Sequence, residues 1–148
     1  PPPLDRTNAL LSFAYSLLTS DCAAALEGAG LDPYVGFLHR ARPGRRSLAL
    51  DLMEELRTVL ADRFVLSCIN QKVLNAKHFE KQENGAILLT EEGRRAFLNA
   101  WQQKKREVIT HPFLKEKLCW GLVPYVQALL LARTLRGDLE VYPPFFWK

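Results

Sequence analysis

Three side chains, His39, Asp51 and Glu54, have the types and spacing from which a divalent metal site can be built. Hard cations such as Mg²⁺ and Mn²⁺ take carboxylate oxygens and accept an imidazole nitrogen, and a catalytic site leaves positions open for water and substrate. Asp51 and Glu54 are three residues apart, so a helix places them one turn apart on one face. His39 lies in the segment before that helix, from which its ring can reach the same face. These residues are our candidate catalytic set, and the chemistry they permit is metal-assisted hydrolysis.

The same three residues also fit a role without any chemistry. Two acids on a helix commonly form a solvated face, and a single histidine commonly caps or packs. Their spacing alone does not decide between the two interpretations.

A group of arginines accompanies these candidates. Four of them stand in the loop over residues 40–46, and a fifth follows on the acidic helix: Arg40, Arg42, Arg45, Arg46 and Arg57. Arginines beside an acidic pair could bind DNA phosphates next to a metal, or they could only keep a surface soluble. The net charge of +4 favours a polyanionic partner without establishing one.

The other reactive or aromatic side chains do not form a recognisable catalytic motif. His78 and His111 have no partner at metal-ligand spacing, so we predict packing or surface roles for both. The cysteines are odd in number and widely spaced among apolar residues, which indicates neither disulfides nor a zinc site and fits a reducing cytoplasm. The late aromatic residues could stack on bases, but we expect them to pin segments to the core; they are Trp101, Trp120, Phe145, Phe146 and Trp147.

Apolar periodicity and capping residues predict a mainly α fold. We expect long helices over about 8–29, 47–70, 91–106 and 122–136. The Asn84–Gly85 dipeptide predicts at most one small β-hairpin, near residues 79–89. With 148 residues and 48% apolar content, the chain should form one domain around one core.

The ends of the chain and its most apolar stretch bear on its organisation. Residues 1–6 begin with three prolines, as the remnant of a linker would, which suggests a fragment. The stretch from Gly121 to Leu135 is too short to cross a bilayer, so we expect a soluble cytoplasmic protein with no membrane partner.

One long segment resembles a known family. The run GLDPYVGFLHRARPGRRSLALDLMEELR from Gly30 to Arg57 is similar to the C-terminal helical domain of the CRISPR adaptation endonuclease and integrase. Residues 8–27, the ITHPF segment at 109–113 and residues 121–148 resemble the same family. The pattern GF-x-H followed by an acidic helix is the most specific part of this likeness.

The resemblance implies a metal site. In that family a magnesium or manganese ion is held by a Glu, a His and a second acid. His39 matches the histidine, Glu54 matches the second acid, and Asp51 matches a neighbouring acid that supports the site or contacts the metal. The first Glu has no match in this chain, and neither has the N-terminal β domain that makes the family's homodimer. We therefore expect the 148 residues to be a catalytic helical domain that is inactive alone.

The resemblance also implies a reaction and partners. The complete protein would insert spacer DNA into a CRISPR array and cleave DNA with a metal. Its partners would be the spacer precursor, the array and a small ferredoxin-like adaptation subunit. Two alternatives stay open: a metal-independent DNA- or protein-binding helical module, and a helical metallophosphohydrolase, although the latter would need an adjacent His-Asp pair that the chain lacks.

Overall fold

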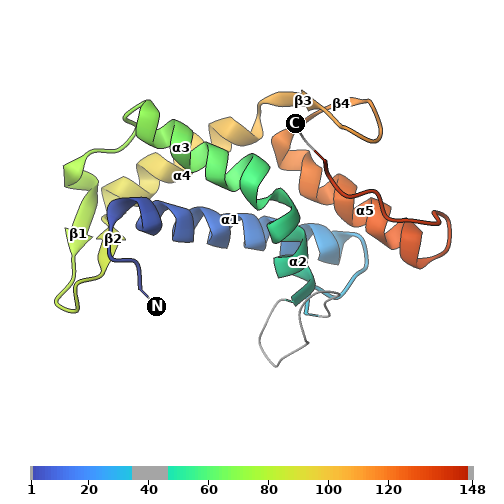
Figure 1. Ribbon diagram of the computed structural model, residues 1–148, viewed down its shortest axis with the longest axis horizontal. Helices are drawn as coiled ribbons and strands as arrows, with labels where there is room; N and C mark the ends of the chain where they lie inside the picture. Colours follow the sequence, from blue (N-terminus) through green and yellow to red (C-terminus); the bar gives the residue numbers. More distant parts are fainter. Residues whose placement is uncertain (1, 35–46, 147–148) are drawn as a thin grey trace.

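The computed structural model describes residues 2–34 and 47–146, and it is mainly helical (Figure 1). This confirms the predicted fold class. The longer helical elements are α1 (Arg6–Gly28), α2 (Ser47–Leu56), the π-helical turn η1 (Arg57–Asp62), α3 (Arg63–Asn70), α4 (Glu91–Lys105) and α5 (Val123–Leu135). Two short 3₁₀ turns, η2 (Ala76–His78) and η3 (Trp120–Leu122), precede β1 and α5.

Helix α1 forms the middle of the molecule, where it contacts α2, η1, α3 and α5 (Figure 1). It begins after Asp5, whose carboxylate accepts the backbone N–H of Asn8 at 2.7 Å. It stops before Gly30, which adopts the left-handed conformation with φ +80°. Among the described residues, α1 is the one helix with the length and composition of a membrane span. In this structure its buried side chains belong to the core.

A single continuous helical segment was predicted over 47–70, and the structure has it as α2, η1 and α3 in succession. The π-helical turn in its middle was not predicted. A π turn inserts one residue into the helical register, so the faces of α2 and α3 do not follow one uninterrupted stripe.

The predicted hairpin is confirmed as β1 (Phe79–Lys81) paired antiparallel with β2 (Ile87–Leu89). The limit of one hairpin was wrong, because β3 (Val108–Thr110) also pairs antiparallel with β4 (Lys117–Cys119). The first ribbon turns at Gly85, whose φ is +87°. The second turns without any glycine, and Lys115 adopts the left-handed conformation.

The remaining helices follow their sequence signals closely. Thr90 caps α4 by accepting the N–H of Gly93 at 3.0 Å, and Lys104 and Lys105 stand in its last turn. Helix α5 ends before Gly137, which has φ +85°.

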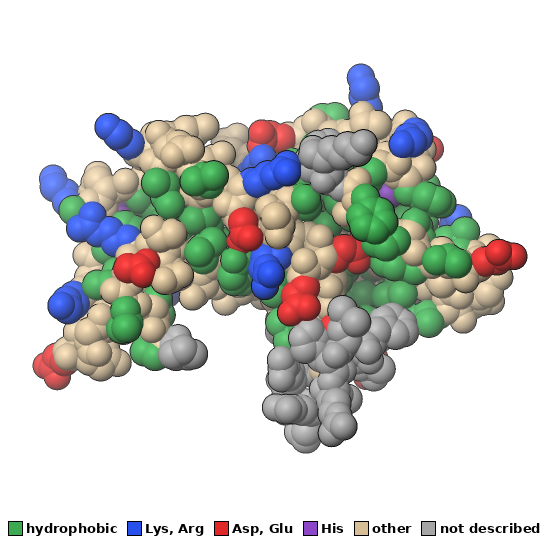
Figure 2. Space-filling model, viewed as in Figure 1, with side chains coloured by type: hydrophobic (Ala, Val, Ile, Leu, Met, Phe, Trp, Pro, Cys, Tyr) green, Lys and Arg blue, Asp and Glu red, His purple; other side chains and the backbone are tan. Residues whose placement is uncertain are grey.

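Two buried clusters lie toward opposite ends of this frame. The β1–β2 end holds the aromatic rings of Phe13, Phe64, Phe97 and Trp101, with centroids 5.0–5.5 Å apart in three pairs. The other end, near β3–β4, holds a T-shaped pair of His111 and Phe145 at 5.3 Å. Charged side chains of both signs lie side by side on the face in Figure 2, and hydrophobic side chains are scattered between them.

Candidate functional site

Three carboxylates line one cavity of about 650 Å³ between α2, α5 and the C-terminal segment, which is the part of the chain after α5, residues 136–146. They are Asp51, Glu54 and Glu55, all on α2. The rest of the wall is mainly apolar and is made by Leu48, Leu52, Leu131, Thr134, Leu135, Tyr142 and Pro144. The attraction between a carboxylate and a cation is stronger where solvent is excluded, as it is at the buried Asp51, than at an exposed side chain such as Glu54.

Asp51 and Glu54 stand where the spacing placed them. Both lie on the wall of the same cavity, Asp51 buried at 9% exposure and Glu54 exposed. Of the arginine candidates, Arg57 is described and exposed, at the start of η1. The other predicted site residues, His39, Arg40, Arg42, Arg45 and Arg46, lie outside the described residues.

The carboxylate of Glu55 is hydrogen-bonded to several groups within the protein. Its Oε1 accepts from the backbone N–H of Phe145 at 2.6 Å and from the amide of Gln127 at 2.9 Å. The hydroxyl of Tyr142 lies 2.9 Å from both carboxylate oxygens. Burial raises the pKa of Glu55, and these hydrogen bonds to its charged form oppose the rise. Glu55 therefore fastens the C-terminal segment to α2.

Gln127 extends this network into α5 and the β3–β4 turn. It is fully buried, and its amide also donates to Tyr142 at 2.7 Å and to the carbonyl of Pro143 at 3.1 Å. Its Oε1 lies 2.7 Å from Nε2 of the buried His111. The backbone N–H groups of Phe113 and Leu114 both donate to Nδ1 of His111, so its ring proton sits on Nε2 and points at Gln127.

The packing or surface roles predicted for His78 and His111 are confirmed. His111 closes the turn between β3 and β4 from inside the core. His78 accepts the backbone N–H of Asn75 at 3.0 Å in a capping box and packs at the start of β1. Cys22, Cys68 and Cys119 are free cysteines, as the absence of a disulfide pattern predicted.

The sequence analysis did not identify the residues that form this hydrogen-bonded network, namely Glu55, Gln127 and Tyr142. Glu55 looks like another surface acid of an amphipathic helix, and its partner Tyr142 is 87 residues away. Gln127 did carry a signal, because it interrupts the most apolar stretch of the chain. A lone polar side chain in a buried helix needs partners, so its position alone points to a buried network.

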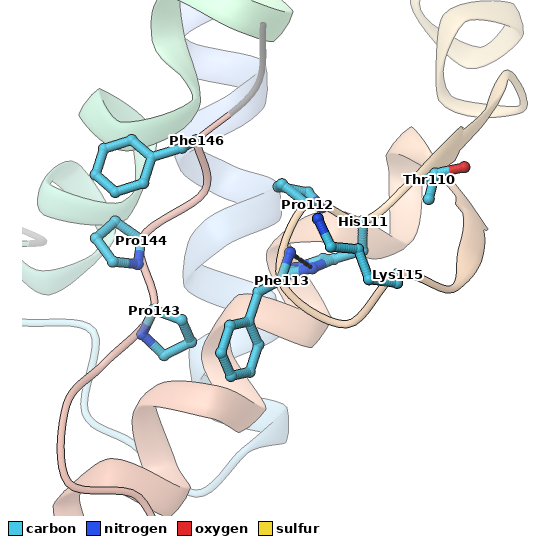
Figure 3. A pocket seen from close by; sticks show the side chains of 8 residues that line it. All are labelled: Thr110, His111, Pro112, Phe113, Lys115, Pro143, Pro144 and Phe146. Carbon is cyan, nitrogen blue, oxygen red and sulfur yellow. Dashed lines mark hydrogen bonds between the residues drawn. The ribbon is translucent and has the colours of Figure 1, made fainter.

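A second cavity, of about 740 Å³, lies on the other side of the C-terminal segment (Figure 3). The turn after β3 contributes His111, Pro112, Phe113 and Lys115, and the C-terminal segment contributes Pro143, Pro144 and Phe146. Pro144 lines both cavities. The segment that Glu55 holds is thus the wall between them.

Of the five late aromatic residues, three lie in the core as predicted. Trp101, Trp120 and Phe145 are buried in the core. Phe146 is 77% exposed at the rim of the second cavity, so it does not pin the segment. Trp147 lies outside the described residues.

The donor chemistry of the first cavity fits a hard divalent cation in part. Carboxylate oxygens are the ligands that Mg²⁺ and Mn²⁺ prefer, and α2 brings the carboxylates of Asp51, Glu54 and Glu55 to one wall. Within residues 2–34 and 47–146, no group of three or more His, Cys, Asp or Glu side chains is close enough to hold a metal.

Comparison with known proteins identifies a family that this chain matches. Residues 1–103 match the protein family described as CRISPR associated protein Cas1. The chain is 63% identical over 147 residues to a CRISPR-associated endonuclease Cas1 from Rhodospirillum rubrum, and 53% identical over 147 residues to one from Chlorobaculum tepidum. Each alignment covers 99% of this chain and 43% of the relative, so the chain spans less than half the length of these curated relatives.

Solved structures agree with the sequence relatives. A casposase bound to an integration product superposes with a TM-score of 0.88 at 29% identity, covering 99% of this chain and 43% of that one. A Cas1 protein from Thermotoga maritima superposes with a TM-score of 0.82 at 30% identity, covering 93% and 42%. The resemblance drawn from the GF-x-H pattern and the acidic helix is confirmed, and the chain belongs to the CRISPR-associated Cas1 family.

Proposed function

We propose that this chain is the helical catalytic domain of a metal-dependent DNA endonuclease and integrase that inserts spacer DNA into CRISPR arrays. The observation that carries the proposal is the pair of carboxylates, Asp51 and Glu54, on the wall of one cavity in a chain of the Cas1 family. The relatives are CRISPR-associated endonucleases, which supports nuclease chemistry at this wall.

In this proposal each candidate has a distinct role. Glu54 and His39 are ligands of a Mg²⁺ or Mn²⁺ ion, and Asp51 either supports Glu54 or contributes a third donor. The ion, when bound, would stabilise the negative charge that develops on a phosphodiester under attack. Arg40, Arg42, Arg45, Arg46 and Arg57 bind phosphates and hold the DNA strand against the carboxylate wall.

Glu55 is excluded from the ligand set by its own contacts. Donors from Gln127, Tyr142 and the Phe145 backbone already surround its carboxylate. Bringing Glu55 to a metal would break these bonds and leave buried donors unsatisfied, at about 1–3 kcal/mol for each.

The proposed site is completed by a Glu that this chain does not contain. The relatives are more than twice the length of their match to this chain, which leaves room for such a ligand in their remaining part. We propose that a β domain outside these residues forms the homodimer, and that the 148-residue chain is inactive without it.

Two similar solved structures support the proposed partners. The casposase is bound to an integration product, which supports DNA as the substrate of this fold. A further similar chain belongs to a Cas6-RT-Cas1–Cas2 complex and superposes with a TM-score of 0.78 at 28% identity. We propose that spacer precursor and CRISPR array bind this protein, together with a small ferredoxin-like adaptation subunit.

A chimera tests the proposal. The matching part of the Rhodospirillum rubrum relative is replaced by this chain, and manganese-dependent cleavage of DNA is measured. We expect cleavage by the chimera and its loss in Glu54→Gln, whereas Glu140→Gln, at an exposed position of the C-terminal segment, keeps full activity. Undiminished cleavage by Glu54→Gln would refute the site.

The rival function gives a different result in the same samples. A metal-independent DNA- or protein-binding module predicts salt-sensitive DNA binding that chelators and His39→Ala leave unchanged. That pattern, together with no cleavage by the chimera, would replace the enzyme with the binding module.

A further inference from the structure

The two end residues of the π-helical turn η1 contact the same tyrosine of α1. The guanidinium carbon of Arg57 lies 5.9 Å from the centroid of the Tyr15 ring. The hydroxyl of Tyr15 donates to Oδ1 of Asp62 at 2.5 Å. One side chain therefore bridges the first and the last residue of the turn.

The hydroxyl of Tyr15 stays protonated, and can donate a hydrogen bond, over a wide pH range. Burial, the hydrogen bond to Asp62 and the negative charge of Asp62 together raise its pKa to about 12. Tyr15 consequently keeps its proton, and its ring stays anchored, at any physiological pH. An anchored ring offers Arg57 a fixed surface to contact, which restricts its rotamers before any ligand binds. The conformational entropy that the long side chain loses on binding a ligand is therefore smaller.

The position of the turn connects it to the carboxylate wall. Arg57 follows Glu54 by three residues, so the two side chains leave neighbouring positions on one side of the helix. A guanidinium that contacts an aromatic ring can still donate N–H groups to other partners, and these groups match the oxygens of a phosphate. π-helical turns occur frequently at functional sites, and this one begins directly after the acidic turn of α2.

We infer that Tyr15 and Asp62 are positioning residues that hold Arg57 ready to bind one DNA phosphate beside Glu54. Arg57 makes the contact, Tyr15 fixes its direction, and Asp62 fixes Tyr15. This inference rests on the proposed function, because it takes DNA as the ligand.

The test is the salt dependence of DNA binding by the 148-residue chain, measured by fluorescence anisotropy with a short blunt duplex. Each phosphate contact contributes about 0.9 to the slope of log affinity against log salt. We expect Arg57→Ala to lower the slope by about that amount, which weakens binding about 5- to 10-fold near 0.1 M salt. Arg95→Ala is the matched control, because Arg95 pairs on the surface with Glu91 at 3.4 Å, and it should keep the slope.

The positioning residues are tested by pairs of variants. Tyr15→Leu removes the ring and should reproduce most of the loss seen with Arg57→Ala, whereas Tyr15→Phe keeps the ring and should retain most of the affinity. Asp62→Asn keeps an oxygen for the Tyr15 hydroxyl and should bind DNA better than Asp62→Ala. A purely structural Tyr15 would change only the melting temperature, so an unchanged slope in folded Tyr15→Leu overturns the inference.

Two readouts separate this inference from the proposed function. If Arg57→Ala keeps the slope while Glu54→Gln abolishes cleavage in the chimera, the positioning role is wrong and the enzyme stands. If the wild-type chain shows no salt-dependent DNA binding, the inference fails on its own. If Arg57→Ala lowers the slope while Glu54→Gln cleaves normally, the phosphate contact stands and the metal site does not.

Discussion

The two buried clusters at opposite ends of the molecule are held together by different physics. At the β1–β2 end, Phe13, Phe64, Phe97 and Trp101 pack ring against ring. At the β3–β4 end, a chain of hydrogen bonds runs from His111 through Gln127 to Glu55 and the C-terminal segment. Ring packing depends on volume, whereas the polar network depends on every donor finding its acceptor.

The difference matters because only the polar cluster adjoins the candidate site. Glu55 and Tyr142 line the same cavity as Asp51 and Glu54. A hydrogen-bonded network has fewer satisfactory arrangements than an apolar cluster, so it defines the shape of the cavity wall more sharply. We conclude that the aromatic end stabilises the fold and that the polar end determines the geometry of the site.

The largest expected effect lies at the aromatic end. Phe97 is fully buried and contacts both Phe13 and Phe64, so Phe97→Ala should lose about 3–5 kcal/mol of unfolding free energy in urea titration. Phe97→Leu refills most of the volume and should cost markedly less. Equal losses for both variants would contradict a cluster held by packing volume.

Gln127→Leu tests the polar end with a change that preserves size. It leaves the Nε2–H of His111 and the carbonyl of Pro143 without their partner, at about 1–3 kcal/mol for each group. Hydrogen exchange should also quicken at the backbone N–H of Phe145, which Glu55 accepts, because the C-terminal segment loosens.

Two further variants show whether this loosening is specific to the network. Gln102→Leu, on the exposed face of α4, should change the unfolding free energy by less than about 0.5 kcal/mol. Phe97→Ala should leave the Phe145 amide protected under conditions where the protein stays folded. Unchanged exchange at Phe145 in Gln127→Leu would mean that the network does not hold the segment.

Alanine substitutions at two glycines compare a backbone position with no room for a Cβ atom and one with ample room. A Cβ at Gly93, in the first turn of α4, would lie 2.4 Å from the carbonyl oxygen of His78, so Gly93→Ala should cost about 1–3 kcal/mol. A Cβ at Gly28, the last residue of α1, meets nothing within 4 Å, so Gly28→Ala should stabilise by up to about 1 kcal/mol. Thermal unfolding of both variants checks the opposite signs.

The effect expected over the narrowest range of conditions is a pH dependence at Tyr15, on α1, because it appears only at alkaline pH. Its pKa is raised from 10.0 to about 12 in the folded protein, so folding favours the protonated hydroxyl. The resulting stabilisation is complete below pH 10 and disappears as the pH rises through about 12. Alkaline unfolding curves of the wild type and Tyr15→Phe should therefore differ below this window and converge within it. Curves that stay parallel throughout would contradict the bond to Asp62.

The sequence predicts some helices and strands of the molecule more accurately than others. Apolar periodicity and the caps at Thr90 and Gly137 placed α4 and α5 within one residue of their observed bounds. The β3–β4 ribbon was missed because no Asn–Gly or Asp–Gly pair marks its turn. The buried side chain of His111 holds that turn, and this contact exists only in the folded protein.

The residues of the candidate site also differ in how well the sequence predicts them. The shared face of Asp51 and Glu54 follows from a spacing of three residues, and the structure places both on one cavity wall. The role of Glu55 could not be predicted, because its partners Gln127 and Phe145 are 72 and 90 residues away. Local spacing predicts which side chains share a helix face, whereas contacts with residues distant in the sequence place Glu55 in a structural network.

The most direct test of the central claim is a calorimetric titration of Mn²⁺ into the chain, its Glu54→Gln variant and the Glu140→Gln control. We predict one weak site in the wild type and in Glu140→Gln, and no binding heat in folded Glu54→Gln. Equal heats in all three proteins, or none in the wild type, would contradict a metal site on the Asp51 and Glu54 wall.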